Sequence, residues 1–139
     1  MKRLLRQAKN QPSQFQISSY PPGTFIHTEK GWYYVLNEVK RLPIITRRTL
    51  DSWNPPVVAE ASEAHQGVKK LKIGVPLKFR NGSLLYSHAS GRMYLISQGK
   101  LRHVTNPDVV EALGYNLKDA VWVSLDEINL HEKGEPLNG

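Results

Sequence analysis

Histidine and carboxylate side chains are the groups in this 139-residue sequence best suited to catalysis or metal binding, and their spacing does not fit either role. No two histidines are four residues apart and there is no His-Glu-x-x-His run, the patterns that place two metal ligands on one helix face. The five are His27, His65, His88, His103 and His131. Cysteine is absent, which excludes thiolate ligands, thiol nucleophiles and disulfides. The sequence therefore predicts no catalytic, cofactor-binding or metal site, and we expect a protein that is not an enzyme.

The remaining polar motifs have structural explanations. Asp108, Asp126 and Glu127 stand at expected helix starts, where a negative charge interacts favourably with the helix dipole by about 0.3 to 1 kcal/mol. The glycines are spaced as hairpin turns and do not form a phosphate-binding loop. Trp32-Tyr33-Tyr34 lies near Lys40 and Arg41, a combination that can stack bases or sugars. Because neighbouring strand residues point to opposite faces, core packing of at least one set of these rings is the favoured interpretation.

Charge is distributed unevenly along the chain. Residues 1–80 carry 14 basic and 5 acidic side chains, whereas residues 81–139 carry 5 basic and 7 acidic ones. Residues 1–21 contain basic but no acidic side chains, are rich in Gln, Asn and Ser, and end at the first of two consecutive prolines, a composition typical of an extended arm. The first half is thus expected to face an anionic partner. The predicted partner-binding residues are Lys2, Arg3, Arg6, Lys9, Lys40, Arg41, Arg47 and Arg48.

Arg47 and Arg48 are expected at the start of a helix. Positive charge is mildly unfavourable there. We therefore expect reversal of both arginines to glutamate to leave the chain folded and to weaken only its attachment to a partner.

Several segments recur in order at a nearly constant offset. Residues 23–27 align with residues 82–86 at an offset of 59, and residues 31–36 align with residues 91–96 at an offset of 60. Residues 74–77, Gly-Val-Pro-Leu, return as residues 134–137, Gly-Glu-Pro-Leu. Collinear matches of this kind indicate a duplicated module of about 60 residues.

Each copy is expected to contain a β-meander followed by a short helix and one more strand. In the second copy, strands are predicted at residues 84–87, 92–97 and 100–104. Asn106 with Pro107, Thr46, and Ser124 with Glu127 are helix-start signals, and Ser62 is expected to cap a helix in the first copy. The predicted fold is α+β, made of an extended basic arm at residues 1–21 and two tandem modules at residues 22–77 and 78–139.

The second copy resembles a short tandem repeat of bacterial and bacteriophage proteins. The similarity rests on Tyr94-Leu95-Ile96, on Gly99-Lys100-Leu101-Arg102, and on Ala112-Leu113-Gly114-Tyr115 after Pro107. The first copy is similar to a divergent form found in tailed-phage proteins, and the resemblance covers residues 22–137. This resemblance implies a non-catalytic building or binding unit of surface and virion proteins.

The expected function is that of a structural protein of a tailed-phage virion, either a head-decorating or a connector or tail accessory subunit. Its partners would be other virion proteins or copies of itself, and it would be made in the host bacterial cytoplasm. No membrane span or secretory signal is expected, because no apolar run approaches the roughly 18 residues that a span requires. A nucleic-acid-binding protein using the basic half is the alternative, and a cell-wall or glycan-binding module is a third.

Overall fold

The computed structural model describes residues 17–138, which form two units, each built around a five-stranded sheet. Unit 1 contains the described residues up to Ile44 together with Pro55–Pro76, and unit 2 contains Ile45–Asn54 and Leu77 onward. Short helices accompany both sheets, so the fold class is α+β as predicted. Most of the arm expected at residues 1–21 lies outside the described residues.

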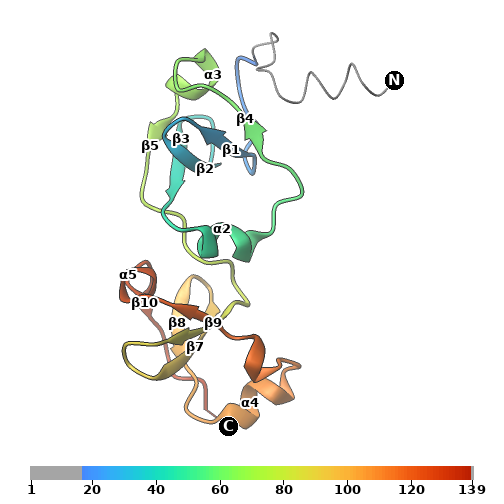
Figure 1. Ribbon diagram of the computed structural model, residues 1–139, viewed down its shortest axis with the longest axis vertical. Coiled ribbons are helices and arrows are strands. Elements are labelled where there is room, and N and C mark those ends of the chain that lie inside the picture. The colour runs from blue at the N-terminus through green and yellow to red at the C-terminus, as the bar shows by residue number, and fades with distance from the viewer. Residues whose placement is uncertain (1–16, 139) are drawn as a thin grey trace, which may run out of the picture. The chain divides into compact units, whose positions relative to one another are not determined.

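Unit 1 has the strand order β4-β1-β2-β3-β5 (Figure 1). The three central strands form an antiparallel meander, and the two-residue edge strands pair with it in parallel. The elements of this unit are β1 (Phe25–Thr28), β2 (Gly31–Val35), β3 (Lys40–Ile44), β4 (Ala59–Glu60), α3 (Gln66–Lys69) and β5 (Lys72–Ile73).

Unit 2 has the strand order β10-β8-β7-β6-β9, again with an antiparallel meander between two parallel edge strands. Read from the other end, this is the order of unit 1. The elements of this unit are α2 (Arg47–Trp53), β6 (Leu84–Ser87), β7 (Arg92–Ser97), β8 (Lys100–His103), α4 (Pro107–Ala112), the 3-10 helix η1 (Leu117–Asp119), β9 (Val121–Val123), α5 (Leu125–Ile128) and β10 (Glu132–Lys133).

The first hairpin differs in length between the units. The pair Thr28 and Gly31 encloses two loop residues, whereas the pair Ser87 and Arg92 encloses four. The second strands of the two meanders therefore correspond at an offset of 61 rather than the expected 60. His88 is the first residue of the longer loop, at the position that Glu29 occupies in unit 1.

The helix starts follow the local signals in the sequence. Thr46 accepts a hydrogen bond from the Thr49 N–H, and Asn106 accepts one from the Asp108 N–H ahead of α4. Ser124 and Glu127 form the predicted capping box of α5. The prediction for Ser62 was wrong, because α3 begins after His65 and the Ser62 hydroxyl accepts from the nearby Ala64 N–H, which closes a turn.

Each sheet has its own apolar core. In unit 1, Ile26, Val35, Val68 and Leu71 pack together with Tyr20. Tyr20 belongs to the segment expected to be an extended arm, yet it is only 8% exposed. The core of unit 2 surrounds Phe79 on one side of the sheet, and Val110 of α4 packs against Leu84 and Leu95 in a second cluster.

Residues 45–54 belong to unit 2, whereas the sequence predicts them within the first module. They lie in the chain between strands of unit 1, but the contacts of α2 group it with unit 2. The Trp53 indole N–H donates to the Lys78 carbonyl at 2.9 Å, and the Arg80 N–H donates to the Ser52 hydroxyl at 3.2 Å. The chain consequently passes from one unit to the other three times.

Candidate interaction surfaces

Arg41, expected to contact a partner, is buried in unit 1. Its guanidinium donates two hydrogen bonds of 2.8 Å to the Glu63 carboxylate and one of 3.2 Å from Nε to the Leu71 carbonyl. It also lies 4.5 Å from the centre of the Tyr33 ring. The hydrogen bonds from Arg41 lower the pKa of Glu63, although burial opposes this. Arg41 is 6% exposed, so its charge is neutralised inside the unit.

Arg48 is bound to a fully buried carboxylate of unit 2. The Glu127 side chain is 0% exposed and accepts hydrogen bonds from Arg48 Nη2 at 2.8 Å, from Thr46 Oγ1 at 2.6 Å and from the Ser124 N–H at 2.8 Å. Burial raises the pKa of Glu127, but these hydrogen bonds together lower it to about 2. Glu127 is thus ionised and attaches the start of α2 to the start of α5.

The other predicted partner-binding cations fall into three groups. Arg47 is exposed and pairs with Asp51 along α2 at 3.0 Å. Lys40 is exposed at the start of β3. Lys2, Arg3, Arg6 and Lys9 lie outside the described residues. Of the eight predicted cations, Lys40 is therefore the described one that is exposed and has no ion pair among the described residues.

A run of lysines in unit 1 extends the surface around Lys40. Lys40 and Lys72 are directly paired residues on the parallel strands β3 and β5. Lys69 and Lys70 end the α3 segment just before β5, and all four side chains are exposed. We call these four residues the lysine surface. Sequence reasoning missed Lys69, Lys70 and Lys72, although the Lys-Lys-Leu-Lys run was visible.

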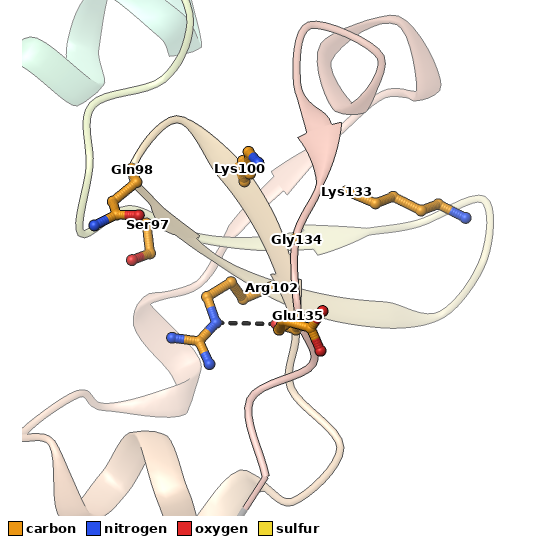
Figure 2. A pocket seen from close by; sticks show the side chains of 7 residues that line it. All are labelled: Ser97, Gln98, Lys100, Arg102, Lys133, Gly134 and Glu135. Carbon is orange, nitrogen blue, oxygen red and sulfur yellow. Dashed lines mark hydrogen bonds between the residues drawn. The ribbon is translucent and has the colours of Figure 1, made fainter.

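Unit 2 carries cations at the corresponding edge of its sheet, around a pocket of about 510 Å³. Arg102 Nε donates to the Glu135 carbonyl at 2.9 Å, and this contact holds the chain after β10 beside β8. Figure 2 shows the Lys133 side chain pointing away from the Arg102 guanidinium. Because the cations do not converge on one point, the pocket is an open charged surface and not a closed site for a small anion. It is lined by Ser97, Gln98, Lys100, Arg102, Lys133, Gly134 and Glu135.

The aromatic run of β2 divides between the two faces of the sheet, as predicted. Tyr33 is buried beneath Arg41, whereas Trp32 is half-buried with its ring 5.1 Å from the His27 ring. A second aromatic group, which the sequence did not reveal, lies in unit 2. There the Trp122 ring is 5.0 Å from the Tyr86 ring and 5.4 Å from the His88 ring.

The described histidines take part in local contacts. His131 is buried and bridges the Gly99 carbonyl, 2.8 Å from Nδ1, and the Phe79 N–H, which donates to Nε2 at 3.1 Å. These partners require a neutral ring with its proton on Nδ1, and burial lowers the pKa of His131. His27 lies 3.0 Å from Glu60. Within residues 17–138, no group of three or more potential ligands is placed to hold a metal ion.

Comparison of the chain with family models, with curated proteins and with solved structures finds no match. The resemblance to the bacterial and bacteriophage repeat therefore stays a prediction. Among the described helices, none is long and apolar enough to cross a membrane.

Proposed function

We propose that this chain is a non-enzymatic interaction protein of a tailed-phage virion, built from two copies of one module and docking through its arm and its first unit. The proposal combines the resemblance of residues 94–115 to a virion-associated repeat with the distribution of charge over the described surface. It gives the protein a structural role, as a head-decorating or a connector or tail accessory subunit.

The two sheets support the duplication. They share one strand order and the same parallel and antiparallel pairings. A glycine packs at the same place in both: a Cβ on Gly74 would be 2.9 Å from a Leu42 methyl group, and a Cβ on Gly134 would be 3.1 Å from the Lys100 Cβ. These glycines are 60 residues apart, at the offset found in the sequence.

The ionisable groups of the chain favour a structural role over a catalytic one. Displaced pKa values cluster at catalytic sites in many enzymes. Here Glu63, Glu127 and Arg48 have displaced pKa values within internal ion pairs, and His131 has one within a backbone bridge. Each of these groups is used to join segments of its own unit.

The lysine surface is the single observation that carries the docking proposal. Like charges on directly paired strand residues are destabilising, and Lys40 and Lys72 occupy such positions with Lys69 and Lys70 nearby in sequence. An anionic partner would offset this repulsion. Ile17, which belongs to the segment without acidic side chains, lies beside the same helix, because a Cβ on Gly67 of α3 would be 2.6 Å from the Ile17 carbonyl oxygen.

The test is incorporation of charge variants into particles. Particles are purified from cells that produce either the wild-type chain or the variant Lys69→Glu/Lys72→Glu, and the copy number of the chain is measured by mass spectrometry. We expect the wild-type chain at a fixed stoichiometry and the variant reduced at least tenfold. Lys118→Glu, an exposed lysine of unit 2, is the matched control and should incorporate normally. Absence of the wild-type chain from particles would refute the proposal.

Nucleic-acid binding is the second candidate, favoured by the cations that line the pocket of unit 2 in addition to the lysine surface. The salt dependence of the binding affinity distinguishes the two functions. Phosphate binding through six or more cations weakens by about three decades between 50 and 200 mM salt, whereas a protein interface with an apolar centre changes much less. A steep salt dependence of duplex DNA binding would favour this candidate over docking to a protein.

A further inference from the structure

Trp122 is an exposed tryptophan held between two other rings. It lies on the edge strand β9 and is 61% exposed. The Tyr86 ring on the adjacent strand β6 is tilted by 46° against it, and the His88 ring is stacked on it at an interplanar angle of 22°. These contacts orient the indole while leaving most of it open to solvent. We call the three residues the aromatic platform.

The first hairpin loop of unit 2 supplies the third ring of the platform. His88 is the first of the four loop residues between Ser87 and Arg92, and Gly91 in the same loop has a φ of 72°. A Cβ on Gly91 would be 3.9 Å from the Tyr86 hydroxyl, so the loop also approaches the polar end of that ring. Two rings that each carry polar groups, those of Tyr86 and His88, consequently lie beside the apolar indole of Trp122.

Unit 1 lacks the platform at the corresponding strand positions. His27 pairs with Glu60 across β1 and β4, as Tyr86 pairs with Trp122 across β6 and β9. The imidazole of His27 is bound to the Glu60 carboxylate at 3.0 Å and lies beside Trp32. A histidine in contact with a carboxylate thus occupies in unit 1 the strand positions where unit 2 has Tyr86 and the exposed Trp122.

Charge indicates which ligand suits the platform. The pocket cations of unit 2 lie on β8 and β10, at the opposite edge of the sheet from β9, with β7 and β6 between them. The exposed charges closest to Trp122 in sequence are mixed: Lys118, Asp119 and Asp126. Arg92, at the end of the loop that carries His88, is paired with Ser87 and not with Tyr86, so its strand position belongs to the other face of the sheet. A polyanion such as single-stranded nucleic acid requires cations beside the stacking rings, and the platform does not combine the two.

We propose that the aromatic platform binds a neutral saccharide. The apolar C–H face of a pyranose ring would stack on Trp122, while the Tyr86 hydroxyl and the His88 imidazole would hydrogen-bond to its hydroxyl groups. Aromatic side chains with one apolar and one polar end suit such amphipathic ligands. This activity lies beyond the docking function proposed above and uses a different unit, so either proposal can fail without the other.

The experiment titrates the full-length chain with neutral tetrasaccharides of glucose, of N-acetylglucosamine and of mannose. Binding is followed by the NMR signals of the three tryptophan indole N–H groups. We expect at least one of these sugars to shift the Trp122 signal with a saturable dose response, and Trp122→Ala to weaken its binding at least tenfold. Because Trp122 is exposed, this variant should remain folded, which its NMR spectrum verifies. Trp32→Phe, in the unit without the platform, is the matched control and should bind within twofold of the wild type.

Three results would overturn the proposal. One is the absence of any saturable shift with all three sugars at millimolar concentration. Another is sugar binding that Trp122→Ala leaves unchanged. The third is binding of oligothymidine that depends on Trp122 and weakens steeply with salt, because the platform would then recognise bases.

Discussion

The hydrogen bonds of Glu127 assign Arg48, which the sequence predicts to contact a partner, to an ion pair inside unit 2. The Glu127 carboxylate is fully buried and accepts hydrogen bonds from a guanidinium, two hydroxyls and a backbone N–H. Removing one partner of a buried charge costs more than the pair contributes, because the remaining charge stays in a poorly solvated place. The structure therefore predicts that reversal of Arg48 to glutamate destabilises unit 2, contrary to the expectation from the sequence.

Replacing Arg48 tests this directly. We expect Arg48→Ala to lower the free energy of unfolding by about 2 kcal/mol, since charged hydrogen bonds contribute roughly 1.5 to 3 kcal/mol. Urea unfolding at pH 7 measures the change. Arg47→Ala removes an exposed pair with Asp51 and should cost less than about 1 kcal/mol. Equal effects of the two substitutions would contradict the assigned role of Glu127.

His131 makes the stability of unit 2 sensitive to acid. Its pKa is lowered by burial in the folded state, so the unfolded chain binds a proton more readily than the folded chain does. The stability that the neutral ring contributes is complete above the ordinary pKa of 6.5 and declines as the pH falls below it. We expect the imidazole signals of His131 to titrate below pH 6.5 in NMR spectra, with His131→Gln identifying them. A midpoint at or above 6.5 would refute the buried, neutral ring.

At the scale of elements, α3 and the segment before β1 depend on one close contact. Gly67 is buried in α3, and a Cβ there would lie 2.6 Å from the Ile17 carbonyl oxygen and 3.2 Å from the Tyr20 ring. Replacing a glycine inside a helix by alanine ordinarily stabilises the helix. Here the methyl group would push the Ile17–Tyr20 segment from its place in the core of unit 1.

Alanine at this position should therefore destabilise the protein. We expect Gly67→Ala to lower the free energy of unfolding by about 2 kcal/mol, within the range of overpacked cores. Thermal and urea unfolding give the measurement, and Gln66→Ala, an exposed position of the same helix, is the control that should change stability by less than about 0.5 kcal/mol. If Gly67→Ala were neutral or stabilising, the segment ending at Tyr20 would not be packed on α3.

The helix starts could be predicted because the capping residues and their hydrogen-bond partners are neighbours in the sequence. Thr46, Asn106 and the Ser124–Glu127 capping box act within three residues, and each begins a helix where the sequence indicated. The second role of Glu127 was not predictable, because Arg48 and Thr46 are 79 and 81 residues away in the chain. The aromatic platform was hidden for the same reason, since only strand pairing brings Trp122 beside Tyr86.

At the scale of the whole molecule, the sequence pattern indicated two similar sheets but not how the chain is divided between them. Periodicity identifies strands and their order in each meander. Periodicity does not show which unit a short helix belongs to, because α2 and α4 both begin at a polar capping residue. The unit of α2 is determined by its hydrogen bonds to the Lys78 carbonyl and to Glu127, which are distant in sequence. The boundary expected after residue 77 lies one residue beyond the last passage of the chain between the units, which follows Pro76, and the expected modules do not include the assignment of residues 45–54 to unit 2.

The assignment of residues 45–54 to unit 2 has a consequence for the order of folding during synthesis. Residues 45–54 leave the ribosome before Glu127, from which Thr46 is separated by 81 positions. At roughly 5 to 20 residues per second, this interval lasts roughly 4 to 16 seconds. Unit 1 ends at Pro76 and is complete well within it. The sheet of unit 1 can therefore form before residue 127 is synthesised, and only after that can Arg48 of α2 pair with the Glu127 carboxylate.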